Sequence, residues 1–272
     1  MKRGRRQLII GAVLTATLIA AALLSLVWTP YPPGTMDIPH KFGPLSSAHW
    51  LGADSLGRDV ASRLLAGARI SIEVGLVAVG IGATAGIAVG LVAASAKGWV
   101  EDVAMRLSDF VFAFPALLLA ILLTSTYGSG VFNAILAIGI ANVPVFAKLT
   151  RAAANGVLAR DYALAARAAG RGPLGIAWHH ILPNVAPILI VQATIQFAIA
   201  VLAEAALSYL GIGARPPEVS WGRMLAEAQQ FMFVAPRLAL FPGLAVALSV
   251  LGLNLLGDGL RDALDPRLRG RR

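Results

Sequence analysis

The feature of this sequence that most restricts its fold is a series of long apolar runs. A helix needs about 20 mostly apolar residues to cross about 30 Å of hydrocarbon. Six runs of roughly that length occur, at residues 8–28, 70–96, 110–126, 131–148, 186–210 and 238–256. The sequence therefore predicts an all-α membrane protein with six transmembrane helices.

Composition excludes a soluble globular class, because 57% of the 272 residues are hydrophobic and only 14% are charged. The absence of cysteine rules out disulfides and thiolate metal sites, and the four histidines are too few for a histidine-rich metal centre. The net charge of +9 is spread between apolar runs. It indicates anionic membrane lipid as a partner and no nucleic acid.

The distribution of Lys and Arg predicts the orientation in the membrane, because positive residues are retained in the cytoplasm. The N-terminus, the connections 97–109 and 148–185 and the C-terminal tail hold 16 Lys and Arg, against 7 in the opposite set. Both termini are therefore predicted to be cytoplasmic. The first run is too long for a signal peptide and is interpreted as a retained anchor. Pro187, and either Pro236 or Pro242, are expected near the starts of the last two spans.

Glycines at positions 82, 86 and 90 repeat every four residues within the second predicted span. This spacing places three positions without side chains near one face of a helix. Such a face allows a neighbouring helix to approach closely. The pattern predicts a packing contact and carries no substrate information.

The connection between the fourth and fifth spans is almost forty residues long and is a candidate for work outside the membrane. Residues 160–169 favour a short helix that begins near Asp161 and stops at Gly170. Residues 174–181 are expected to form a second short helix that ends before Pro183. Two interpretations fit this segment: an amphipathic loop on anionic headgroups, or a knob that docks in a groove of a soluble partner, with exposed arginines meeting an acidic rim.

The same segment resembles the EAA loop of binding-protein-dependent ABC transporter permeases. The resemblance rests on Ala165, Ala166, Gly170, Leu182 and Pro183. It implies that this loop couples the permease to its ATPases, and Arg160, Asp161 and Arg167 are included in the coupling prediction. The sequence departs from the family pattern at Leu164, in a glutamate position, and at His180, in an isoleucine position.

Three further segments resemble the second permease of dipeptide, oligopeptide and nickel importers. They are Leu51 to Asp59 with Ser62, Arg63 and residues 67–69, then residues 210–222, then residues 254–267. The resemblance implies a type I ABC importer permease (MetI-like) core with an additional N-terminal helix. It divides the chain into a basic N-terminus and first helix (1–28), a periplasmic segment (29–68), the transmembrane domain (69–258, with the coupling loop at about 158–184) and a basic cytoplasmic tail (259–272).

The resemblance also implies the partners of this chain. They are a second homologous permease, two ATPase subunits, a periplasmic substrate-binding protein and a peptide substrate, in a bacterial inner membrane. No Gly-x-x-x-x-Gly-Lys-Ser/Thr phosphate loop occurs, so ATP is expected on the partner subunits, and no cofactor is expected on this chain. Nickel or another small solute, and a purely structural membrane scaffold, are alternatives. An intramembrane hydrolase is disfavoured because no histidine lies in a predicted span.

Polar residues within a span are candidates for the translocation path, because they are costly to bury in lipid. Gln192, Gln196 and Glu204 are such candidates in the fifth span, and hydrogen bonding between helices is the alternative for them and for Asn254. The adjacent pair His179 and His180 is not expected to bind nickel, because neighbouring side chains on a helix point about 100° apart.

Overall fold

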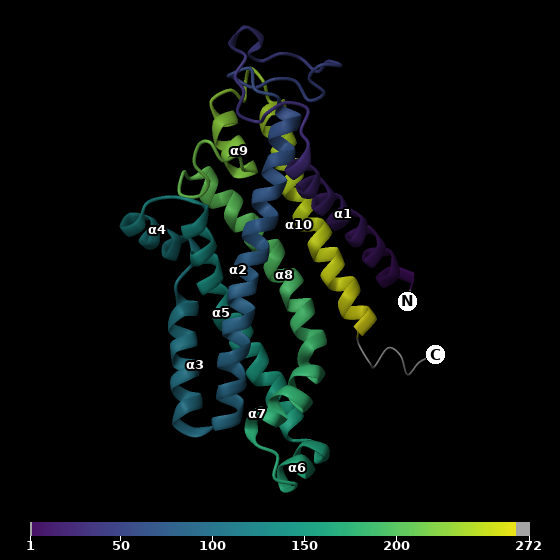
Figure 1. Ribbon diagram of the computed structural model, residues 1–272, viewed down its shortest axis with the longest axis vertical. Helices are drawn as coiled ribbons and strands as arrows, with labels where there is room; N and C mark the ends of the chain where they lie inside the picture. The colour runs from purple at the N-terminus through teal and green to yellow at the C-terminus, as the bar shows by residue number, and fades with distance from the viewer. Residues whose placement is uncertain (1, 265–272) are drawn as a thin grey trace.

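The computed structural model describes residues 2–264, and within that range the long elements are all helices (Figure 1). In chain order the α-helices are α1 (Lys2–Val27), α2 (Val60–Ala96), α3 (Gly98–Ala113), α4 (Ala116–Tyr127), α5 (Val131–Leu158), α6 (Asp161–Ala168), α7 (Pro173–Ile176), α8 (Leu182–Tyr209), α9 (Trp221–Gln229) and α10 (Arg237–Leu264). A 3-10 turn at Ile38–His40 and a π turn at Ala177–Ile181 complete the series.

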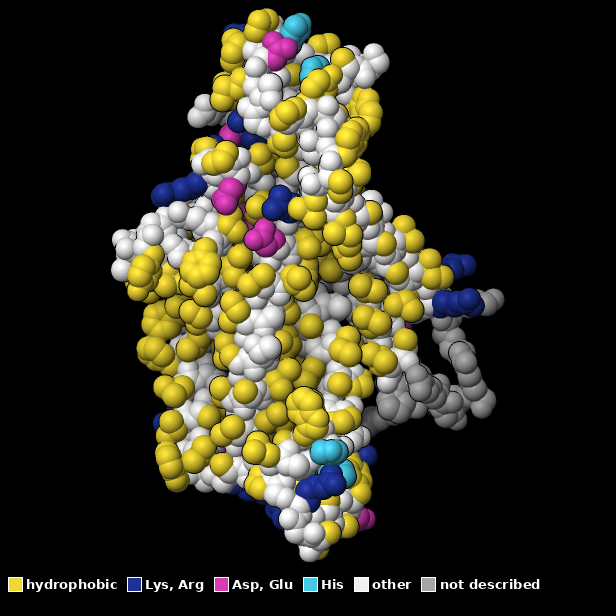
Figure 2. Space-filling model, viewed as in Figure 1, with side chains coloured by type: hydrophobic (Ala, Val, Ile, Leu, Met, Phe, Trp, Pro, Cys, Tyr) yellow, Lys and Arg dark blue, Asp and Glu magenta, His cyan; other side chains and the backbone are white. Residues whose placement is uncertain are grey.

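Five helical stretches are long and apolar enough to cross a membrane: α1, α2, α5, the continuous stretch Pro173–Tyr209, and α10. A sixth crossing results if α3 and α4 are counted together. Figure 1 shows an elongated bundle with the segment before α2 and helix α9 at one end, and α6 and α7 at the other. Hydrophobic side chains cover most of the middle of the face seen in Figure 2.

The predicted span at residues 110–126 is not one straight helix, because the chain bends by 82° between α3 and α4. Phe114 takes an extended conformation (φ −88°, ψ 119°) directly before Pro115. A proline disfavours helical geometry in the residue before it and has no N–H of its own to continue the helical ladder. Hydropathy correctly identified the apolar run. The steric effect of Pro115 divides that run into α3 and α4.

Charged pairs tie α3 to α5. Lys148 Nζ lies 2.6 Å from Asp109 Oδ1, and Arg151 Nε donates to Glu101 Oε1. The Lys148 ammonium also lies 4.5 Å from the centroid of the Phe112 ring. These contacts link α3 to α5, although the bend before α4 separates α3 from the other part of the predicted span.

The expectation that prolines mark the starts of the last two spans holds for Pro236, which directly precedes α10. It is wrong for Pro187, which lies inside α8. Pro242, the alternative to Pro236, lies inside α10. The reason is that α8 begins earlier, at Leu182, with Pro183 already in its first turn. Pro187 and Pro242 are the sixth residues of α8 and α10, past the four unpaired N–H groups of a helix start, so each leaves one helical hydrogen bond unmade.

The predicted glycine face of α2 is confirmed as a packing seam against α5. A Cβ added at Gly86 would lie 2.5 Å from the carbonyl oxygen of Val143 and 2.6 Å from Phe146 Cβ. At Gly82 and Gly90 an added Cβ would equally meet α5 within 2.3 and 2.5 Å. The two helices therefore approach as closely as side-chain-free positions allow.

Helices α1 and α10 pack side by side and antiparallel. Gly11 abuts Leu256, and Gly252 abuts Leu14, so residue numbers rise on one helix as they fall on the other. The beginning of α1 and the end of α10 consequently lie at the same end of this pair, as Figure 1 shows. An even number of crossings follows, which requires α3 and α4 to count as one. Of the predicted basic tail, residues 265–272 lie outside the described range.

Candidate functional site

The segment predicted to couple the permease to a partner forms a compact projection at the end of the bundle that lies opposite α9 (Figure 1). Helix α6 begins with Asp161 in its first turn, as predicted, where a negative charge is favourable. It ends at Gly170, whose φ of +80° is a conformation that favours glycine. The N–H groups of Gly170 and Arg171 donate to the carbonyls of Arg167 and Ala166 and close the helix end.

The second predicted short helix does not end before Pro183. Helix α7 runs through the π turn Ala177–Ile181 directly into α8. The N–H of Leu182 donates to the carbonyl of Ala177, five residues back, so the helix widens by one residue just before the proline. The predicted stop is wrong because the chain stays helical through Pro183, with the π turn directly before it. The projection is therefore a rigid continuation of a membrane span.

Most of the projection faces outward. Ala163 is buried, whereas Ala165 is exposed and Ala166 half-buried. Leu174, at the start of α7, is 87% exposed. A large exposed apolar side chain on a rigid projection is typical of a docking surface.

The basic residues of the projection, Arg160, Arg167 and Arg171, are exposed. Arg160 directly precedes α6. Arg167 and Arg171 line a hollow of about 660 Å³ together with Lys97, which follows the last residue of α2. Within residues 2–264 none of these four side chains forms an ion pair. Figure 2 shows Lys, Arg and His side chains gathered at this end of the molecule.

The two positions that depart from the EAA pattern have different surroundings. Leu164 is exposed on α6. The ring of His180, in the π turn, lies 6.0 Å from the ring of Tyr162, which is also on α6. His179 Nδ1 lies 3.1 Å from the carbonyl oxygen of Gly175. Among the described residues no group of three or more His, Cys, Asp or Glu side chains is arranged to hold a metal ion.

The predicted path residues of α8 lie at different depths. Gln192 is half-buried, whereas Gln196 is 5% exposed and Glu204 is 1% exposed. Gln196 Nε2 donates to Asn142 Oδ1 on α5 at 2.8 Å, which is the hydrogen bonding between helices expected as the alternative. Glu204 Oε1 accepts a hydrogen bond from Ser208 at 2.7 Å. Asn254 is exposed on α10.

Sequence reasoning missed a cluster of charged residues at the opposite end of the bundle. Asp54, Arg58 and Arg63 come together there with Glu227 of α9. Three of these residues fall in a segment singled out by its resemblance to a family. Their pairing with a residue more than 160 positions away had no sequence signal.

Comparison with known proteins gives a consistent family. Residues 86–270 match the family described as binding-protein-dependent transport system inner membrane component. A glutathione transport system permease of Pectobacterium atrosepticum is 45% identical over 82% of this chain and 74% of its own length. A dipeptide transport system permease of Alkalihalophilus pseudofirmus is 39% identical over 96% of this chain and 86% of its own.

A solved structure supports the fold independently. A chain of the MetNI methionine ABC transporter, in an inward-facing conformation, superposes with a TM-score of 0.59 at 21% identity. The superposition covers 74% of this chain and 96% of that one. With the described helices and the two permeases above, the chain therefore belongs to the family of binding-protein-dependent transport system inner membrane components, as a permease subunit of an ABC importer and not as an enzyme.

Proposed function

We propose that this chain is one of two homologous permeases that form the path for peptide uptake across a bacterial inner membrane. The observation that carries the proposal is the 39% identity to a dipeptide permease over 96% of this chain. The glutathione permease supports the same substrate class, because glutathione is itself a small peptide. Nickel or another small solute is the weaker alternative, since neither of these relatives is named for one.

In this proposal the projection formed by α6, Gly170 and α7 docks on an ATPase subunit, and the transporter contains two such subunits. Ala165 and Ala166 allow the partner backbone to come close, while Arg160, Arg167 and Arg171 face an acidic rim. Leu182 and Pro183 join the projection rigidly to α8, so a displacement of α6 is transmitted to a membrane span. The ATPase must bind two conformations with different free energies for ATP to shift the permease between them.

The opposite end of the bundle would then face the periplasm and receive the substrate-binding protein. Both termini would then lie in the cytoplasm, as the charge distribution predicts. Of the path candidates, Gln192 is half-buried in the described conformation. Gln196 and Glu204 would reach a path only in a conformation in which α8 moves away from its neighbours.

The orientation can be tested by labelling, because the chain has no cysteine of its own. Leu174→Cys on the projection and Phe233→Cys at the opposite end both introduce a thiol at a strongly exposed position. In intact spheroplasts an impermeant maleimide is expected to label the second variant and not the first. Labelling of Leu174→Cys from outside would contradict the docking proposal.

Coupling can be tested with a matched pair of glycine variants in the complete transporter reconstituted in liposomes. Nothing lies within 4 Å of a Cβ added at Gly170 or at Gly172, so neither substitution causes a clash. Only Gly170 has a positive φ, so Gly170→Val strains the end of α6 whereas Gly172→Val (φ −66°, ψ 164°) does not. Gly170→Val is expected to lose dipeptide uptake while ATP hydrolysis continues.

Three outcomes would change the proposal. Equal dipeptide uptake in both variants would remove the coupling role from the projection. Uptake of nickel in place of dipeptides by the unaltered transporter would leave the permease function intact and overturn the substrate class. A scaffold protein would instead fail to co-purify with two ATPase subunits.

A further inference from the structure

Residues 28–59 and helix α9 form a cap over the outer end of α2, opposite the coupling projection (Figure 1). We call these residues together the outer cap. Asp59 caps the start of α2 by accepting a hydrogen bond from the N–H of Ser62 at 2.7 Å. The cap is thus attached to α2 at the first residue of that helix.

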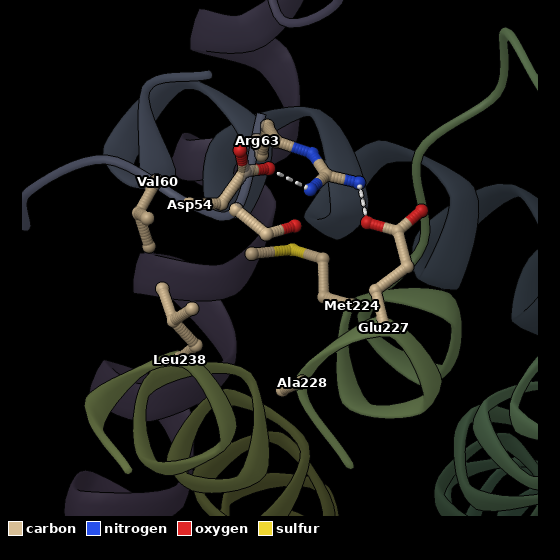
Figure 3. A pocket seen from close by; sticks show the side chains of 8 residues that line it. Asp54, Val60, Arg63, Met224, Glu227, Ala228 and Leu238 are labelled. Carbon is tan, nitrogen blue, oxygen red and sulfur yellow. Dashed lines mark hydrogen bonds and ion pairs between the residues drawn. The ribbon is translucent and has the colours of Figure 1, made fainter. Parts of the chain in front are cut away.

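Four charged side chains at this junction form a closed ring, which Figure 3 shows in part. Arg58 and Arg63 each bond both carboxylates, Asp54 and Glu227. Arg58 donates to Asp54 Oδ2 at 2.7 Å and to Glu227 Oε2 at 2.6 Å, and Arg63 Nη2 donates to Glu227 Oε2 at 2.8 Å. We call these four residues the charge ring. It joins the segment before α2, α2 itself and α9.

Three members of the ring are largely buried. The side chains of Arg63, Asp54 and Arg58 are 3%, 8% and 12% exposed, whereas that of Glu227 is 26% exposed. Each planar guanidinium presents several donors in a fixed fork, which suits a group that must bridge two carboxylates. Loss of one member would leave buried charges without partners, which is costly in a place with little water.

Further contacts fasten α9 to α2 and the cap to α10. Trp221 Nε1 of α9 donates to the carbonyl of Leu64 on α2 at 2.9 Å. The Trp221 ring lies over Gly67, where an added Cβ would come within 2.5 Å of it. Arg237, at the start of α10, donates to the carbonyls of Phe42 and Gly43 in the cap.

Helix α2 connects this junction to the coupling end without a break. Its 37 residues extend for about 55 Å at 1.5 Å per residue. Its last residues, Ser95 and Ala96, line the hollow that also contains Arg167 and Arg171 of the projection. One continuous helix therefore touches the proposed docking region at one end and the charge ring at the other.

We propose that the charge ring makes the outer cap an extension of α2, so that the cap and α2 move as one body when the transporter changes conformation. Arg63 and Glu227 are positioning residues in this proposal and touch no substrate. A displacement of the coupling end of α2 then moves the periplasmic surface with it. By linkage, a protein that binds the cap more tightly in one conformation also favours the position of the coupling end that belongs to that conformation.

The test measures distances between spin labels in the complete transporter, where the cysteine-free chain allows selective labelling. Ser47→Cys in the cap is paired with Thr84→Cys on α2 or with Gln229→Cys at the end of α9; all three positions are exposed. Double electron–electron resonance is recorded without nucleotide and with ATP bound to a hydrolysis-deficient ATPase partner. Both pairs are expected to give one narrow distance that is the same in the two states.

Arg63→Gln is expected to broaden both distributions and to make the distances differ between the two states. Arg63→Lys should not restore the narrow distance, because one ammonium group lacks the planar fork that bridges the two carboxylates. Arg223→Gln is the matched control, since Arg223 bonds Glu227 only within α9, at 2.9 Å, and joins no other element. If Arg63→Gln fails to accumulate, Glu227→Gln supplies the same test, because Glu227 carries both ring links to α9.

A functional measurement separates positioning from general stability. Peptide uptake is expected to fall in Arg63→Gln while ATP hydrolysis without binding protein is retained. Two results would overturn the inference. One is a distance that changes between the nucleotide states in the native chain. The other is a distance distribution that stays narrow in both Arg63→Gln and Glu227→Gln. The distance result does not depend on the substrate, so it stands or falls separately from the proposed peptide function.

Discussion

The substitution Gly86→Ala tests whether the seam between α2 and α5 is as close as the structure describes. The added methyl group would lie 2.5 Å from the Val143 carbonyl oxygen, 2.6 Å from Phe146 Cβ and 3.0 Å from the Ala147 nitrogen. Gly80 on the same helix provides the matched control, because nothing lies within 4 Å of a Cβ added there. The two substitutions change the helix propensity of α2 equally and differ in the contact they create.

The magnitude follows from these distances. Ordinary contacts of a methyl carbon begin near 3.4 Å, so α2 and α5 must separate by about 1 Å, which forfeits a quarter to a half of the dispersion energy of the affected contacts. Overpacking of this kind costs about 1–3 kcal/mol, against a gain of about 0.5–1 kcal/mol from replacing glycine in a helix. We expect Gly86→Ala to be destabilised by about 1–2 kcal/mol and Gly80→Ala to be neutral or slightly stabilised.

The assay is thermal unfolding of the purified transporter in detergent, followed by the solubility of this subunit. A change of 1 kcal/mol corresponds to about 2–4 °C in Tm for a chain of this size class. The Tm of Gly86→Ala should therefore fall by a few degrees, while that of Gly80→Ala should not. Equal Tm values for the two variants would refute the close approach of α2 and α5.

Three further predictions concern buried polar contacts. Burial raises the pKa of Glu227, but Arg63, with help from Arg223 and Arg58, outweighs it and holds the pKa below the usual 4.5. The ionised Glu227 carboxylate therefore stabilises the folded chain fully above pH 4.5, and this stabilisation is lost as the pH falls through the lowered pKa. Tm should fall more steeply below pH 4.5 in the native chain than in Glu227→Gln, and parallel curves would contradict this. Gln196→Leu should destabilise the chain by about 1–3 kcal/mol by leaving Asn142 unpaired; a double-mutant cycle with Asn142→Leu should give a coupling energy, and simple additivity would argue against the bond. Trp221→Phe should cost about 1 kcal/mol in denaturant unfolding, through loss of the bond to Leu64, and an unchanged midpoint would exclude that bond.

Much of the fold could be predicted from the sequence because membrane spans impose a strong, local rule on composition. The glycine spacing at 82, 86 and 90 correctly indicated a packing face, since helical periodicity alone places these residues together. The break at Pro115 was missed because averaged hydropathy is insensitive to one steric exclusion. The helices also extend beyond the predicted spans: α2 begins at Val60, ten residues before the predicted start.

The candidate site was predictable where its chemistry is local. Gly170 ends α6 as expected, because the helix stop depends on neighbouring residues only. The continuation of α7 into α8 was not predicted, since a π turn before Pro183 has no simple sequence signature. The charge ring required contacts between Arg58 and Glu227, which are 169 positions apart, and periodicity does not report contacts of that range.

The charged pairs between α3 and α5 have a consequence for how the chain is inserted during synthesis. Helix α3 contains Glu101, Asp102, Arg106 and Asp109 among 16 residues, and α4, at about 18 Å, is too short to cross on its own. Lys148 and Arg151 of α5 neutralise two of these charges. We therefore expect α3, α4 and α5 to enter the membrane as one unit and not as separate helices.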